Sequence, residues 1–194
     1  MPWLQTDEAE DVICSIEHCS TCLDLIAGNP VHWKWAIIAL QNALQGAMVC
    51  HLAGTANLGH LRANSATEWL NWYASGRVGK VPTDWMADPQ TLLERVAGQK
   101  PRIEHGSGSV LAITDDEISA FKALNGLRKQ FAHFNPMGWS IQLDGLPHIF
   151  GLCASIIEKT SQDPWPFRHL SEDRRVKLNE AIASLKKQIE SHQP

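Results

Sequence analysis

The stretch WKWAIIALQNALQGAMVCHL, residues 33–52, decides the fold class of this chain. Its apolar residues recur every three or four positions, which is the spacing of a buried helical stripe and not the alternation of a strand. Five polar residues interrupt the stretch, whereas a membrane span needs roughly 20 predominantly apolar residues. We therefore expect a long buried helix and no membrane segment. The stripe comprises Trp33, Ile37, Leu40, Leu44, Ala47, Met48 and Leu52.

The segment before this helix has the same periodicity from about residue 7 to residue 27. Its stripe is formed by Val12, Ile16, Cys19, Leu23 and Ile26. The tripeptide Gly28-Asn29-Pro30 ends this helix and predicts the start of the next, because an asparagine can cap a helix and a proline fits its first turn. Two long helices joined by so short a turn are expected to form an antiparallel hairpin.

Three further helices are expected in the last third of the chain. Thr114 followed by three acids indicates a capped helix start, and that helix should run to about Phe134. After a stop at residues 135–138, residues 139–143 alternate as a short strand-like link would. Helices should follow at 147–160 and after Ser171. The fold class is thus all-α, an antiparallel four- to five-helix bundle.

The middle of the chain, residues 55–113, has a weaker helical signal and is expected to be a small helical insertion within a single domain spanning residues 1–194. Short helices are predicted at about 67–74 and 89–97, the second introduced by Asp88-Pro89. Residues 99–109 contain Pro101 and the run GSGS, which is typical of a flexible surface loop. No Lys-Ser or Lys-Thr follows, so we expect no phosphate-binding loop.

Composition restricts the class of protein further. The chain has 194 residues, of which 44% are hydrophobic and 20% charged, as in an ordinary globular protein. The acidic N-terminus lacks the pattern of a secretory signal, and five cysteines, an odd number, lie mostly in helical segments. These features favour reduced thiols and a cytoplasmic location. Because the net charge is −4, any nucleic-acid binding would need a local basic patch.

The helix expected at 114–134 carries the residues that could perform chemistry. Asn125, Lys129 and His133 are spaced by four, so they should stack along one polar face. Arg128 falls at the edge of the apolar arc. The pattern predicts a basic ridge beside an apolar surface. The arc consists of Phe121, Leu124, Leu127, Phe131 and Phe134.

Residues 127–134, LRKQFAHF, resemble the Arg-x4-6-His motif of the HEPN superfamily, a group of helical bundles found in toxin, defence and RNA-processing proteins. Leu124-Asn125 and the segment Trp139-Ser140-Ile141 also fit bacterial proteins of this kind. The resemblance covers the bundle helices and not residues 55–113. It implies a HEPN-like bundle that forms a homodimer and cuts RNA at the subunit interface without a metal or another cofactor.

The resemblance also implies roles for individual residues. His133 would transfer protons, because imidazole exchanges protons near neutral pH, and Arg128 would hold the phosphate. Asn125 and Lys129 would be supporting substrate contacts. Catalytic members commonly have a small polar residue where this chain has Lys129. The alternative is therefore a non-catalytic HEPN-like module for dimerisation and for binding a nucleotide, a cognate antitoxin or another partner protein.

Structural explanations of these residues, and other candidate sites, also follow from the sequence. Arg128 can simply pair with an acid, and His133 can simply cap a helix. Cys14, His18 and Cys22 share a helix face with Cys19 nearby, but no second knuckle completes a zinc site, so no metal is expected. Trp33 is expected in the core, whereas Trp69, Trp72 and Trp139 are available for stacking. The basic residues of the last helix fit a solvated face: Arg174, Arg175, Lys177, Lys186 and Lys187.

Overall fold

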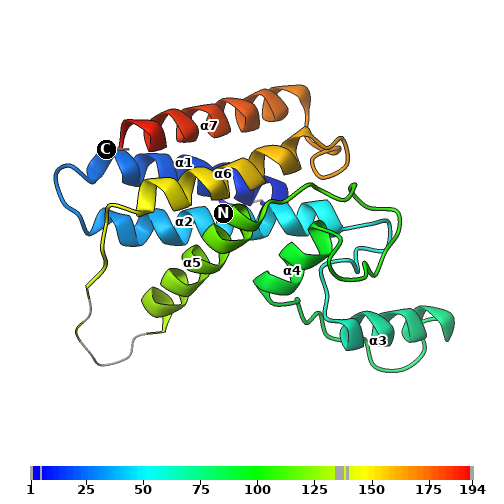
Figure 1. The fold of residues 1–194 in the computed structure, drawn as a ribbon. Coiled ribbons are helices and arrows are strands. Elements are labelled where there is room, and N and C mark those ends of the chain that lie inside the picture. The colour runs from blue at the N-terminus through cyan, green and yellow to red at the C-terminus, as the bar shows by residue number, and fades with distance from the viewer. Residues whose placement is uncertain (1, 5, 134–137, 139, 193–194) are drawn as a thin grey trace.

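Helices make up nearly all regular structure in the computed structural model, which describes residues 2–4, 6–133, 138 and 140–192. Within these residues no strand occurs, and one isolated bridge joins Leu61 to Met86. The expected all-α class is confirmed (Figure 1). In chain order the helices are α1 (Glu8–Leu25), α2 (His32–Leu52), α3 (Ala63–Ala74), α4 (Pro89–Val96), α5 (Asp115–Ala132), α6 (Leu146–Gln162) and α7 (Glu172–Ser191).

Two antiparallel hairpins form the bundle. One is α1–α2, as the turn at residues 28–30 predicted, and the other is α6–α7 (Figure 1). The hairpins pack together through α1 on α7 and α2 on α6. Helix α2 lies at the centre and is buried on most of its circumference, which explains why its sequence is apolar well beyond one stripe. Helix α5 packs across α2 and α6, and α4 packs on α2.

Side-chain caps fix most helix starts. Asp7 accepts a hydrogen bond from the N–H of Glu10, Asp88 from that of Thr91, and Ser171 from that of Arg174. The start of α2 differs from the expectation, since the helix begins at His32 after a turn. Asn29 caps that turn by accepting a hydrogen bond from the N–H of Val31 at 3.0 Å.

The insertion contains two parts that differ in how they attach to the bundle. Helix α4 contacts α2 and α5, whereas α3 packs on no other helix in the part of the chain that the structure describes. We call residues 55–87, which include α3, the arm; it projects from the bundle in Figure 1. The arm has a small core of its own, in which Leu58, Leu61 and Ala66 pack with Trp69 and Ile103.

A carboxylate and a guanidinium hold the root of the arm. Glu104 accepts hydrogen bonds from four backbone N–H groups, those of residues 54, 56, 58 and 59, at 2.6–3.1 Å. Arg95, only 5% exposed, donates to the carbonyls of Gly59 and Leu61. Charged hydrogen bonds of this kind are stronger than neutral ones. The polar backbone between α2 and α3 is therefore satisfied by two side chains from the second half of the insertion.

The loop expected to be flexible is fixed at its C-terminal end. The His51 ring donates from Nε2 to the carbonyl of Ser109 at 2.7 Å, and the N–H of Gly108 donates back to the carbonyl of His51. Asp163 accepts from both the N–H and the hydroxyl of Ser109. Burial lowers the pKa of His51 and so favours the neutral ring, in the form that carries its proton on Nε2.

We predict that Gly59→Ala destabilises the attachment of the arm. A Cβ at this position would lie 1.8 Å from the backbone oxygen of Leu52, and the backbone cannot yield as a flexible side chain would. Overpacking of this kind costs about 1–3 kcal/mol of unfolding free energy. Urea unfolding measures the loss. Gly106→Ala is the matched control, because nothing lies within 4 Å of its Cβ; equal stability of the two variants would contradict the prediction.

Candidate functional site

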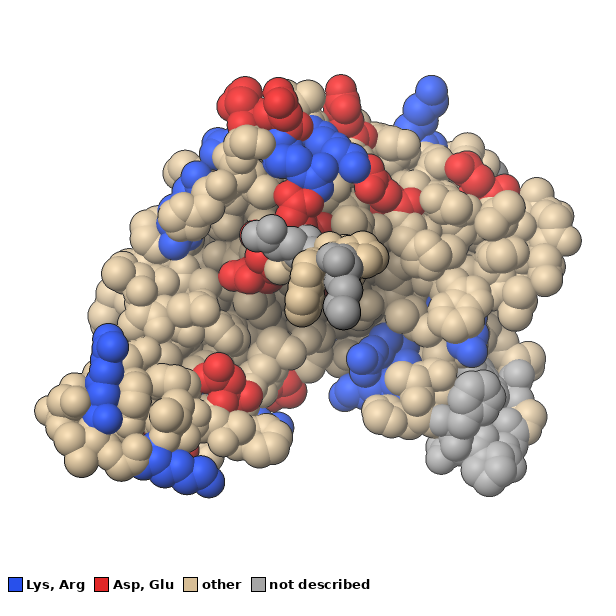
Figure 2. All heavy atoms as spheres, turned by 180° about the vertical axis from the view of Figure 1, so that it is seen from behind, with Lys and Arg blue, Asp and Glu red and all other residues tan. Residues whose placement is uncertain are grey.

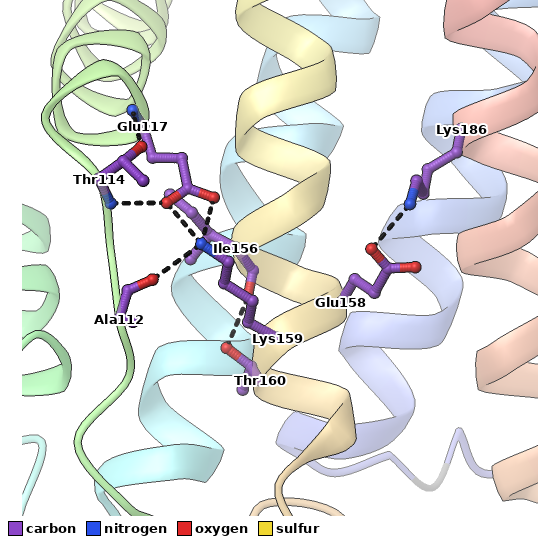
Figure 3. A network of polar contacts seen from close by, with 8 residues as sticks. All are labelled: Ala112, Thr114, Glu117, Ile156, Glu158, Lys159, Thr160 and Lys186. Carbon is purple, nitrogen blue, oxygen red and sulfur yellow. Dashed lines mark hydrogen bonds and ion pairs between the residues drawn. The ribbon is translucent and has the colours of Figure 1, made fainter.

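Helix α5 is fixed at its N-terminus and leaves the bundle toward its C-terminus. Thr114 and Glu117 form a reciprocal capping box, the N–H of each donating to the side chain of the other. Lys159 of α6 donates to both carboxylate oxygens of Glu117 at 2.7 Å and to the carbonyl of Ala112 at 2.8 Å (Figure 3). The start of the helix is therefore attached to α6 by a charged network.

Burial decreases along α5. Phe121 and Leu124 are fully buried, Leu127 and Phe131 are half-buried, and the last residues of the helix are mostly exposed. The predicted apolar arc is thus confirmed for four of its members, and the fifth, Phe134, lies outside the described residues. This gradient places the candidate motif, residues 128–133, on the part of α5 that the bundle covers least.

The motif residues have different surroundings. Arg128 is partly buried, and no carboxylate among the described residues forms an ion pair with it. His133 is exposed and is the C-cap residue of α5. Lys129 is exposed, whereas Asn125 is only 8% exposed. The predicted basic ridge therefore contains Arg128, Lys129 and His133, and Asn125 lies beneath it instead of on it.

A shallow apolar groove runs beside the motif. Its volume is about 380 Å³, and its walls are α5, the link that leads into α6, and the start of α6. Gly126 leaves the groove open, since nothing lies within 4 Å of the position of a Cβ there. We call this feature the α5 groove. Its lining is Lys122, Ala123, Gly126, Leu127, Gln130, Ile141, Gln142, Gly145, Leu146 and Ile149.

The link leading into α6 is irregular where it is described. Residues 140–143 form no strand, so the strand-like expectation is wrong for them; residue 139 lies outside the described part. The apolar Ile141 contacts the core instead of pairing with another extended segment. Leu143, the next apolar residue, is 36% exposed, so the alternation does not correspond to a buried face in the described part of this stretch.

The cysteines of α1 are buried or lie apart as single thiols in the structure. Burial raises the pKa values of Cys19 and Cys22, so both thiols keep their protons. Cys19 donates to the carbonyl of Ala36, and the sulfur of Cys22 lies 3.7 Å from Nε2 of His18. Among the described residues no group of three or more His, Cys, Asp or Glu side chains is arranged to hold a metal ion.

A pocket of about 270 Å³ at the other end of the bundle is lined by Cys50, Arg168 and His169. Burial is the largest cause that raises the pKa of Cys50, so it is not an activated nucleophile. Arg168 stacks on the ring of Trp165 at 3.8 Å and donates to the Trp165 carbonyl. These contacts position a loop and provide no reactive group.

The basic residues of α7 are largely used inside the protein. Arg174 pairs with Glu10, Lys177 with Glu17 at 2.9 Å, and Lys186 with Glu158 at 2.7 Å. The last helix thus offers no concentrated positive surface. Trp33 is 5% exposed and meets Phe150 edge-on at 5.3 Å, which confirms the expected core role.

The sequence offered Trp69 and Trp72 for stacking but did not predict the hollow of about 420 Å³ that the arm contains between α3 and residues 78–83. The sequence signal was the density of aromatic residues, since Trp69, Trp72, Tyr73 and Trp85 fall within 17 residues and the chain has no other tyrosine. Of these four aromatic residues, only Trp69 packs in the small core of the arm, so the core does not explain the other three.

Comparison with known proteins found no match to this chain among protein-family models, curated proteins or solved structures. None of the helices in the described residues is long and apolar enough to cross a membrane.

Proposed function

We propose that this chain is a HEPN-like, metal-independent endoribonuclease whose site is completed when two copies pair along α5. One observation carries the proposal: Arg128 and His133 lie on the least covered part of α5, and Arg128 has no ion pair among the described residues. Had Arg128 been buried against a carboxylate, it would have been a structural residue. Its charge is instead available for a phosphate.

The proposed chemistry uses two copies of each residue. One His133 takes the proton of a ribose 2′-hydroxyl while that oxygen attacks phosphorus, and the second copy of His133 donates a proton to the departing 5′-oxygen. Arg128 stabilises the negative charge that builds up on the phosphoryl oxygens. The products are a 2′,3′-cyclic phosphate and a 5′-hydroxyl. A single chain places only one histidine in the motif, so pairing supplies the missing acid or base.

The α5 groove supports the pairing. Leu127, Ile141, Leu146 and Ile149 give it an apolar lining directly beside the motif. Contiguous apolar surface on a protein commonly marks an association site. A twofold axis near this groove would bring the two copies of α5 together, and with them both motifs.

The test is incubation of a mixed-sequence RNA with purified protein in EDTA, followed by analysis of the product ends. We expect cleavage with 2′,3′-cyclic phosphate and 5′-hydroxyl ends. Cleavage that requires an added metal ion, or that leaves 5′-phosphates, would contradict the mechanism. An absence of cleavage under all conditions would favour the non-catalytic HEPN-like module, which would use the same groove to bind itself or a partner protein.

We predict that Gly126→Glu dissociates the dimer without unfolding the subunit. The new side chain meets no atom of its own chain near its Cβ, but it places a charge in the groove that the second copy is proposed to cover. A loss of 1.4 kcal/mol already weakens association about tenfold. Sedimentation velocity measures the oligomeric state. Gly126→Ala is the control and should still dimerise; a Gly126→Glu protein that dimerises normally would exclude the groove as the interface.

A further inference from the structure

The arm carries an aromatic surface that its own core does not use. Trp85 is 55% and Tyr73 39% exposed, and Trp72 forms part of the wall of the arm hollow. Trp72 and Tyr73 lie 5.5 Å apart, and both contact Trp69, which anchors them to the small core. These rings are therefore held in place by packing while part of their surface faces solvent.

Positive side chains accompany these rings. The guanidinium of Arg77 lies over Trp72 and Tyr73 at 5.9 and 5.7 Å, and that of Arg62 lies over Trp85 at 5.8 Å. Lys80 lines the arm hollow. No ion pair engages any of these three cations within the described residues, in contrast to the paired cations of α7. Their charges are thus available to an anion.

The local charge also differs from that of the whole chain. Residues 55–87 contain three Lys and Arg residues against two acids, Glu68 and Asp84, whereas the chain as a whole carries −4. Figure 2 shows the arm from behind as a separate lobe at lower left that carries Lys and Arg side chains, with Asp or Glu side chains beside them. The arm is therefore slightly positive in a chain that is negative as a whole.

We propose that the arm binds single-stranded RNA, with unpaired bases stacking on Tyr73 and Trp85 and the backbone contacting Arg77, Arg62 and Lys80. Interleaved aromatic and basic side chains are the usual means of holding single strands without a fixed sequence, because every base has a face that can stack. The arm hollow, with Trp72, Asn71 and Lys80 in its wall, has the size of a small-ligand pocket and takes one nucleotide. Glu68 at the same hollow accepts hydrogen bonds from a base amino group.

A partner protein would be the other occupant of such a surface, since Leu70, Val78 and Val81 are also exposed. The unpaired cations next to the rings favour RNA. An apolar partner surface would leave Arg62, Arg77 and Lys80 without counter-charges, whereas each phosphate of a strand supplies one.

The choice of RNA as the ligand rests on the proposed function. The test measures RNA binding and does not depend on RNA cleavage. Anisotropy of a fluorescein-labelled 12-nucleotide RNA is measured with the His133→Ala protein, so that the probe stays intact. On this background, Trp85→Ala is expected to weaken binding roughly fivefold to 100-fold through the loss of one stacked base, and Lys80→Gln is expected to weaken it less and to reduce its salt dependence through the loss of one phosphate contact. Both side chains lie at exposed positions, and circular dichroism checks that the variants fold.

Trp35→Ala is the matched control. Trp35 is 46% exposed and has the ammonium of Lys34 over its ring at 4.7 Å, but it lies on α2 and not on the arm. It should bind RNA like the parent. Unchanged binding by the arm variants, equal weakening by Trp35→Ala, or equal affinity for an RNA duplex would each overturn the inference and assign the surface to a protein partner.

The two proposals can fail separately. If no RNA is cut but the arm variants still lose single-strand binding, the nuclease proposal fails and the arm inference stands. If cleavage depends on His133 while the arm variants bind like their parent, the arm inference alone is overturned.

Discussion

The His133→Ala protein is expected to cut RNA roughly 10²–10⁴-fold more slowly than the wild type, because a positioned acid or base contributes about that much to proton transfer. Arg128→Ala is expected to lose roughly 10²–10³-fold, the usual effect of removing one group that stabilises transition-state charge. Both residues lie on the exposed end of α5 or at its edge, so neither substitution should unfold the bundle. Initial cleavage rates in EDTA measure the losses.

His105→Ala is the control for the histidine, since His105 is exposed on a loop of the insertion. It should cut at the wild-type rate. Cleavage that survives both motif substitutions would come from a different site or from a contaminating nuclease, and either result would remove the motif from the mechanism.

A mixing experiment tests whether the site spans two subunits. When wild-type and His133→Ala proteins exchange subunits, each heterodimer keeps only one His133 and lacks either the acid or the base. Heterodimers are therefore expected to cut far more slowly than the wild-type homodimer, so that the cleavage rate falls faster than the share of wild-type chains. If heterodimers form, as shown by differently tagged subunits, and the rate falls only in proportion to that share, each chain must act with its own arginine and histidine alone.

The apolar spacing in the sequence was sufficient to predict the helices of the bundle. Buried stripes at three- and four-residue intervals and local caps such as Thr114 and Ser171 act within a few residues, so they are visible in sequence. The start of α2 shifted from Pro30 to His32 because Asn29 caps a preceding turn instead of the helix. Single hydrogen bonds of this kind decide where a helix begins, and the spacing of apolar residues does not show which of several possible bonds will form.

The attachment of the insertion could not be predicted, because its partners are far apart in the chain. Glu104 holds backbone groups about fifty positions earlier, and His51 holds the carbonyl of Ser109. A GSGS run is ordinarily a sign of flexibility, but here the absence of large side chains lets Gly108 lie against the His51 ring, where a Cβ would clash at 2.4 Å.

The candidate residues lie on α5 or at its C-cap, where the sequence predicted a helix, but their surroundings could be described only from the structure. Asn125 follows Phe121 by four positions, so the neighbouring helices cover it with the apolar arc. The spacing of residues in sequence gives the angle at which a side chain leaves the helix axis. It does not show how much of the helix surface the neighbouring helices bury. The sequence likewise could not show that the cations of α7 are paired and those of the arm are not.

The Lys159→Met protein is expected to lose about 1–3 kcal/mol of unfolding free energy at neutral pH, because the buried carboxylate of Glu117 loses its ion-pair partner while Lys159 itself is 31% exposed. Glu117 is 3% exposed, and Lys159 supplies its only ion pair among the described residues. The companion pair joins Glu158 of α6 to Lys186 of α7, and these side chains are 34% and 38% exposed (Figure 3). Lys186→Met is therefore the control and should cost less than about 1 kcal/mol.

The pH dependence of this loss identifies its cause. Burial alone would raise the pKa of Glu117, but hydrogen bonds from Lys159 and from the Thr114 N–H outweigh it, so the pKa lies below its ordinary value. In the wild type, the ionised carboxylate stabilises the fold above about pH 4.3, the unfolded value, and this stabilisation is lost as the pH falls through the lower folded value. In Lys159→Met the hydrogen bonds from Lys159 are gone, so burial is expected to raise the pKa of Glu117, and protonation of its carboxylate relieves the variant as the pH falls. Urea unfolding at several pH values should show that the difference in unfolding free energy between wild type and variant becomes smaller as the pH falls below neutrality.

The double variant Glu117→Gln/Lys159→Met should recover part of the lost unfolding free energy at pH 7, because it has no buried charge. If the difference between wild type and Lys159→Met does not change with pH, the loss comes from the packing of the lysine stem.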